Sequence, residues 1–200
     1  MLRSTARRGS RHRAGKTLPA GRCSLAAPGL GWLFYTFCFV SILTVLPPYI
    51  PQDVRALVMG AMPLTSIAVS MTLGVWLLGR RSAVWVVCVG FGLSALSILW
   101  LWVQPGLPLA CLALAAAMGL IQGATFTAVP QLNGTAATQA QANGAMAQMG
   151  NLGNTLGTPV MAAALAGLGY TGLPLLAGTA FVAGLALHLL LAAQRRRVTA

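Results

Sequence analysis

Acidic side chains are almost missing from this sequence. Its 200 residues include 13 Lys and Arg, two His and a single carboxylate, Asp53. One carboxylate cannot form the acid–base pair of a glycosidase, and it is too few for the oxygen cage of a calcium or magnesium site. The composition therefore excludes both kinds of carboxylate chemistry.

Cysteine pairs with the spacing of metal ligands are also missing. No two of the four cysteines form a Cys-x-x-Cys pair, so neither a zinc site nor a disulfide framework is indicated. Three of them lie in apolar runs, where cysteine usually behaves as a small hydrophobic side chain. We therefore expect no metal and no cofactor. The cysteines are Cys23, Cys38, Cys88 and Cys111.

Charge of either sign is scarce. Only 7% of the residues are charged and 57% are hydrophobic, whereas a soluble protein has about 25% charged residues. Six apolar runs, at 30–50, 56–78, 83–103, 109–132, 141–166 and 173–193, contain no Asp, Glu, Lys or Arg. Each run is close to the roughly 20 residues that cross a bilayer, and lipid forces such runs into helices. The predicted fold class is all-α: a polytopic membrane protein with six transmembrane helices in contact with the lipid bilayer.

The basic residues gather on one side of this six-helix arrangement. They precede the first span, lie in the connector after the second span and follow the sixth span, whereas the other side has only Arg55. The positive-inside rule then places both termini in the cytoplasm. We predict a multi-pass protein of the cell membrane, the inner membrane of a bacterium. The clustered residues are Arg3, Arg7, Arg8, Arg11, Arg13, Lys16, Arg22, Arg80, Arg81, Arg195, Arg196 and Arg197.

Charge also divides the chain into three parts: a basic N-terminal segment at 1–28, a transmembrane domain at 29–194 and a basic tail at 195–200. The N-terminal segment fits a solvated cytoplasmic linker, a contact with anionic lipid or the end of a longer chain. A transit peptide fits less well, because the segment lacks an apolar helical face. It has no aromatic residue or motif that would support nucleic-acid binding, so we expect no nucleic-acid partner.

The fifth span carries a polar stripe. With about 100° per residue, three Asn and one Thr fall within an arc of about 80°, beside a strip of glycines. The glycines would let another helix approach closely. Because a polar stripe facing lipid is costly, we expect it to face a water-filled cavity; the alternative is hydrogen bonding between helices only. The stripe is Asn143, Asn151, Asn154 and Thr158, and the glycine strip is Gly150, Gly153 and Gly157.

The fourth and first spans add polar candidates. Gln122 lies within the pair Gly119-x-x-x-Gly123, and an amide in lipid needs a partner on another helix or on a solute. Thr125 and Tyr35 are weaker candidates, since hydroxyl groups in helices often bond back to their own backbone. We therefore expect Gln122, Thr125 and Tyr35 to bind a small-molecule solute together with the polar stripe of the fifth span.

The third and sixth spans have few polar residues. The third contains Ser94 and Ser97, and the sixth contains Thr179 and His188. We expect both spans to lie toward lipid, with His188 near the membrane interface, where helix ends reach water. Tryptophans near the span ends are expected to be interfacial anchors; these are Trp32, Trp100 and Trp102.

This pattern resembles half of a major facilitator superfamily transporter, in which the third and sixth helices are peripheral. The connector GVWLLGRR at 74–81 is similar to the family's cytoplasmic loop Gly-x-x-x-Asp-Arg-x-Gly-Arg-Arg, without its acidic residue and first arginine. The run 144–159, with Gly153, Gly157 and Pro159, is similar to the glycine-rich penultimate helix of the family's C-terminal half. The resemblance covers about 29–197.

The resemblance implies a C-terminal six-helix half built as a 3+3 inverted repeat, which moves a small solute by alternating access. A second six-helix half is then required, either a missing N-terminal half, a partner chain or a second copy. We expect no transport by this chain alone and no enzymatic activity. Because the spans contain no carboxylate, they cannot hold a proton-coupling acid.

Two other functions fit parts of the sequence. Six spans in about 200 residues also fit the substrate-binding subunit of an energy-coupling uptake transporter, which would co-purify with a pair of ATPases. A more remote alternative is an intramembrane serine protease, with Ser94 and His188 as nucleophile and base. The sequence Gly92-Leu93-Ser94-Ala95 lacks the second glycine of a Gly-x-Ser-x-Gly motif.

Overall fold

Helices make up the part of the chain that the structure describes. The computed structural model describes residues 20–199, and the side chains of residues 23–197. No strand occurs within these residues, which confirms the all-α prediction. The helices are α1 (Ala20–Val45), α2 (Arg55–Val69), α3 (Val75–Leu78), α4 (Ala83–Val103), α5 (Pro108–Leu132), α6 (Ala136–Leu168) and α7 (Gly172–Thr199); the turns are η1 (Pro47–Tyr49), η2 (Ser70–Gly74) and η3 (Gly169–Thr171).

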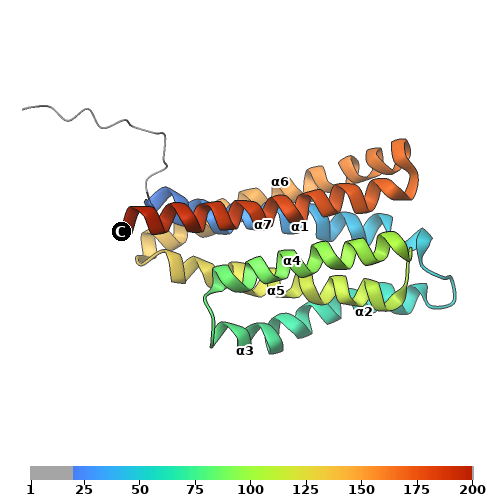
Figure 1. Ribbon diagram of the computed structural model, residues 1–200, viewed down its shortest axis with the longest axis horizontal. Coiled ribbons are helices and arrows are strands. Elements are labelled where there is room, and N and C mark those ends of the chain that lie inside the picture. Colours follow the sequence, from blue (N-terminus) through green and yellow to red (C-terminus); the bar gives the residue numbers. More distant parts are fainter. Residues whose placement is uncertain (1–19, 200) are drawn as a thin grey trace, which may run out of the picture.

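Five helical stretches are long and apolar enough to cross a bilayer. The first four are Cys23–Val45, Arg55–Leu78, Ala83–Val103 and Pro108–Leu132. The fifth, Ala136–Arg197, contains α6 and α7 up to Arg197; η3 separates these two helices, and they run in opposite directions (Figure 1). The chain is thus a helical, multi-pass membrane protein.

The helices pack in two layers. One layer has the order α2–α5–α1–α6, because α5 contacts α2 and α1, and α1 contacts α6 along its length. The second layer is α4 and α7, which contact each other; α4 covers α5, and α7 covers α1 (Figure 1). The sparsely polar helices α4 and α7 therefore cover one side of the four-helix layer.

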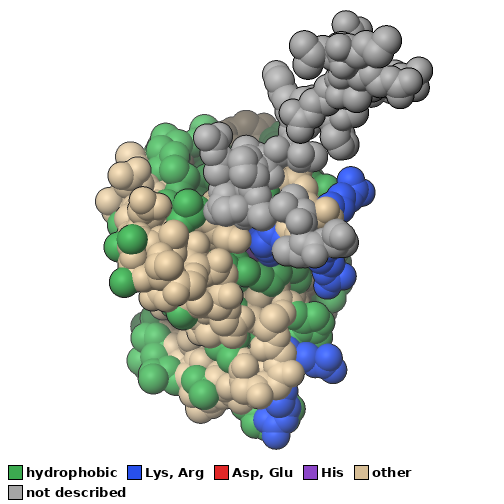
Figure 2. Space-filling view, turned by 90° about the vertical axis from the view of Figure 1, so that its left-hand side faces the viewer, with side chains coloured by type: hydrophobic (Ala, Val, Ile, Leu, Met, Phe, Trp, Pro, Cys, Tyr) green, Lys and Arg blue, Asp and Glu red, His purple; other side chains and the backbone are tan. Residues whose placement is uncertain are grey.

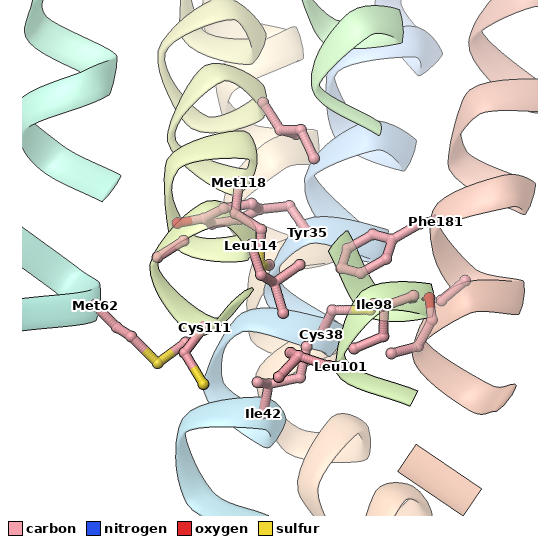
Figure 3. Packing of buried hydrophobic residues seen from close by; sticks show 14 of the residues in the cluster. Tyr35, Cys38, Ile42, Met62, Ile98, Leu101, Cys111, Leu114, Met118 and Phe181 are labelled. Atoms are coloured by element: carbon pink, nitrogen blue, oxygen red, sulfur yellow. Dashed lines mark hydrogen bonds between the residues drawn. The ribbon is translucent and has the colours of Figure 1, made fainter. Parts of the chain in front are cut away.

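The core lies between the two layers. Leu114 and Met118 of α5 and Ile42 of α1 are buried among side chains of α4 and α7, such as Ile98 and Phe181 (Figure 3). These side chains are large and uncharged, so close packing and dispersion hold the layers together in lipid, where no hydrophobic driving force acts between helices.

The glycine strip of α6 packs directly on α1, as predicted. A Cβ atom at Gly150 would lie 2.6 Å from Trp32 Nε1, and a Cβ atom at Gly153 would lie 2.7 Å from the Leu33 carbonyl oxygen. A Cβ atom at Gly157 would meet the backbone of Phe37. Only glycine leaves room for this approach, which explains why α1 and α6 share the longest interface.

Glycine and proline also shape the end of the bundle at the α1–α2 connection. Pro47 and Pro48 stop the α-helix, and the chain continues in the 3-10 turn η1. Gly106, in the α4–α5 connection, has φ +69° and packs against the Tyr49 carbonyl, a position that a side chain would occupy only with strain. Tyr170 closes this end by donating a hydrogen bond to the Leu101 carbonyl at 2.6 Å.

The first helix differs from its predicted bounds. We expected a helix over 30–50, but the chain is already helical at Ala20, the first residue that the structure describes, and α1 ends at Val45. The extra turns are stabilised by tertiary packing: Cys23 and Ala27 are buried against Leu191 of α7. Trp32 therefore lies well inside α1, not near its end as expected for an interfacial anchor. The basic residues up to Lys16 lie outside the described part of the chain.

Most of the described arginines lie at one end of the helix bundle. Arg80 and Arg81 follow α3, and Arg195, Arg196 and Arg197 lie near the end of α7. Figure 2 shows basic side chains gathered on this end of the molecule, which we call the basic end. Asp53 lies in the α1–α2 connection at the opposite end (Figure 1). The bundle is therefore strongly polarised in charge along its axis.

Candidate functional site

The four-helix layer has one side that α4 and α7 leave uncovered. Leu152 and Leu156 of α6 point toward α7, because they line a shared pocket with Leu176 and Ala180. The polar stripe lies across the glycine strip from these leucines, so it belongs to the uncovered side. We call this side the open face; the residues that define it are Trp32, Gln122, Phe126, Asn143, Asn151 and Asn154.

Three asparagines of the polar stripe are exposed on the open face. Asn143, Asn151 and Asn154 are all exposed, and Thr158 is half-buried. None of these four side chains forms a hydrogen bond within the described part of the chain. Their amide groups therefore do not bond to the other helices described here, and they are available to water, a solute or a partner.

Gln122 is the centre of a polar contact between three helices. Its Oε1 atom accepts a hydrogen bond from the Tyr35 hydroxyl of α1 at 3.1 Å and from the Ser66 hydroxyl of α2 at 3.5 Å. Gln122 is half-buried, and its Nε2 group has no hydrogen-bond partner among residues 23–197. One amide thus holds α1, α2 and α5 together and still offers a donor.

Aromatic rings surround this polar contact. Tyr35 stacks between two rings of α1, with ring centroids 4.7 Å from Trp32 and 5.3 Å from Phe39. Trp32 also contacts Phe126 of α5 edge to face at 4.8 Å. The Phe126 side chain is 51% exposed, so an apolar ring lies on the open face next to the amide. The site therefore combines amide donors with flat apolar surfaces.

Two predicted site residues lie away from the open surface. Thr125 is fully buried, and its hydroxyl donates to the Ile121 carbonyl of its own helix at 2.7 Å. Tyr35 is 4% exposed and reaches the site through Gln122. The structure thus brings Tyr35 and Gln122 together, and no hydrogen bond joins either of them to the asparagines of α6 within the described part of the chain.

The His188 side chain is buried inside the bundle, whereas a histidine whose side chain reaches water was expected. Its side chain is 1% exposed, and its ring lies 5.8 Å from Phe91 of α4. The Nε2 atom occupies the space left by the missing side chain of Gly31.

Ser94 and His188 do not form a nucleophile–base pair. Ser94 Oγ and both ring nitrogens of His188 are buried without a hydrogen-bond partner in the described structure. A serine protease needs its hydroxyl within hydrogen-bond reach of the base. The arrangement here lacks that contact. Among the described side chains, no three His, Cys, Asp or Glu come together to hold a metal ion.

Ser66 and Trp32 also belong to the site. From the sequence, Ser66 was a weak lining candidate, because hydroxyl groups in helices often bond back to their own backbone, and Trp32 was expected to be an interfacial anchor. Gly119 packs against the Ser66 backbone, and this close approach carries the Ser66 hydroxyl to Gln122. The Gly119-x-x-x-Gly123 spacing was therefore a usable signal for the contact between α5 and α2.

No protein-family model matches the chain, and no curated protein matches it.

Proposed function

We propose that the chain is one six-helix half of a secondary transporter of the major facilitator kind, with α6 and α7 as two separate spans. The open face forms one wall of the solute path, and a second six-helix half forms the other. Alternating access then arises from rocking of the two halves around a site near the membrane midplane.

The observation that carries this proposal is the arrangement of polarity across the two layers. The covering helices α4 and α7 correspond to the third and sixth spans, which the resemblance makes peripheral. The remaining helices present exposed asparagines and the Gln122 amide on the side away from that cover. Polar groups within membrane spans mark solute pathways, because they are costly to leave in lipid.

The side chains of the open face favour an uncharged solute. Within the described part of the chain, the face offers amide groups and aromatic rings but no acidic or basic side chain of the spans. Amides bind hydroxyl, carbonyl and amide groups, and rings bind apolar surface. We infer a small, weakly polar molecule with both kinds of surface, held from the other side by the second half.

Thiol accessibility in membranes tests this proposal. In a Cys88→Ala background, Asn151→Cys and Asn154→Cys are expected to react about tenfold faster with a charged, membrane-impermeant thiosulfonate than Leu152→Cys and Leu156→Cys, because a thiol reacts as its thiolate, which forms in water. Leu152 and Leu156 are matched controls: they lie on the same turns of α6 and are 43% and 45% exposed.

The pattern of reactivity separates the competing interpretations. Slow, equal reaction at all four positions would place the polar stripe against lipid and would contradict a solute path. Reactive asparagine positions in a chain that co-purifies with a pair of ATPases would favour the uptake-subunit alternative.

A further inference from the structure

A groove lies at the basic end, between the start of α4 and the end of α7. Its volume is about 410 Å³. Val84, Cys88, Leu189 and Ala192 give it an apolar lining, and Arg195 and Arg196 belong to its wall. The groove is on the covered side of the bundle, formed by α4 and α7, so it is separate from the open face.

The positive charge around this groove is concentrated by the fold. The Arg81 guanidinium lies 5.5 Å from the Trp85 ring, which also lines the groove. Arg195 is held in place by a hydrogen bond from Nη1 to the Cys23 carbonyl of α1 at 3.4 Å. The one acidic side chain of the sequence, Asp53, is at the other end of the bundle. The local field therefore favours an anion.

The start of α4 adds to this field. Ser82 caps the helix, with its hydroxyl accepting a hydrogen bond from the Trp85 backbone N–H at 3.4 Å. Ser82 lines the groove, so the positive end of a 21-residue helix faces the same space as the two arginines. Trp85 is 44% exposed, as expected for a tryptophan at the level of lipid headgroups.

We propose that this groove binds an anionic phospholipid. Its phosphate contacts Arg195 and Arg196 near the end of α7, and one acyl chain lies along Val84, Cys88 and Leu189. Arginine pairs with phosphate oxygens in a planar, two-pronged geometry, and basic pockets between transmembrane helices bind acidic headgroups. The apolar lining distinguishes a lipid from a free phosphate, which would leave that surface uncovered.

Native mass spectrometry of the full chain in a neutral maltoside detergent tests this site. We expect dioleoylphosphatidylglycerol to bind at about tenfold lower concentration than dioleoylphosphatidylcholine, because the arginines attract only the lipid with net negative charge. Arg196→Gln should lower this preference several-fold, and Arg195→Gln/Arg196→Gln should abolish it. Arg80→Gln is the matched control, because Arg80 is at the same end but stacks on Trp76, outside the groove.

A second variant tests the acyl contact without changing charge. Ala192→Trp should fill the groove and lower phosphatidylglycerol binding, with both arginines retained. Glycerol phosphate should not displace the lipid; displacement would identify a free-phosphate site and overturn the proposal. Equal binding of the two lipids, an unchanged preference in the double variant, or an equal loss in Arg80→Gln would also overturn it. Unchanged thermal unfolding of Arg196→Gln and Ala192→Trp would show that the fold is intact.

Discussion

A Gly153→Leu variant is expected to lose the packing of α6 on α1, and with it about 3 kcal/mol or more of folding free energy. A Cβ atom at this position would lie 2.7 Å from the Leu33 carbonyl oxygen and 2.9 Å from the Phe37 nitrogen, and it would also meet Thr36 Oγ1. Two of these atoms belong to the α1 backbone, so they yield only if the whole helix moves. Equilibrium unfolding in mixed detergent micelles, followed by circular dichroism, measures the loss.

Gly144→Leu is the matched control on the same helix. A Cβ atom at Gly144 would have no neighbour within 4 Å. Leucine is a better helix former than glycine by up to about 1 kcal/mol, so both variants gain the same amount of helix stability. The difference between their free energies of unfolding therefore measures the α1–α6 contact. A Gly153→Leu variant as stable as Gly144→Leu would show that the two helices do not pack closely at this point.

Gln122→Leu is expected to lower the free energy of unfolding by about 1–2 kcal/mol, which is the upper range for interhelical hydrogen bonds in membranes. The substitution removes the acceptor of both Tyr35 and Ser66. Tyr35 is 4% exposed, so its buried hydroxyl would lose the Gln122 acceptor, and a buried donor that loses its acceptor costs more than the net value of the lost bond. The same unfolding measurement gives the size of the effect.

A double-mutant cycle makes this expectation specific to the Tyr35–Gln122 contact. Tyr35→Phe removes the buried donor, so Gln122→Leu should cost less in the Tyr35→Phe background than in the wild-type chain. The Ser66 hydroxyl can donate to a carbonyl of its own helix when Gln122 is replaced, so the cycle needs no substitution at Ser66. Additive costs in the cycle would mean that the Tyr35 hydroxyl does not depend on Gln122.

The sequence was sufficient to predict features that depend on a single helix, such as its bounds and its close-packing side. The predicted bounds 83–103 coincide with α4, because Ser82 caps its start and Gln104 ends a run without charges. The side of α6 that packs closely followed from the spacing of Gly150, Gly153 and Gly157. These features depend on local periodicity and small size, which a sequence displays directly.

The sequence was insufficient to predict features that depend on packing between segments far apart in the chain. Residues 20–28 were expected to belong to the basic N-terminal segment, but they form part of α1, which contains Pro28 and packs against α7 there. The place of His188 depends on Gly31, a residue more than 150 positions earlier. The contact of Ser66 with Gln122 likewise needs α2 and α5 to be adjacent, which hydropathy alone does not tell.

The hydroxyl groups of α1 bear on how the protein is made. Its principal partner α6 begins at Ala136, long after α1 ends at Val45, so at ribosomal speed α1 waits on the order of ten seconds for that partner. Thr36 and Ser41 donate to the Trp32 and Phe37 carbonyls of their own helix. These two hydroxyl groups therefore have hydrogen-bond partners before α1 contacts any other helix. A newly synthesised α1 can lie in lipid without unpaired hydroxyl groups until α6, which packs on it through glycines, is inserted.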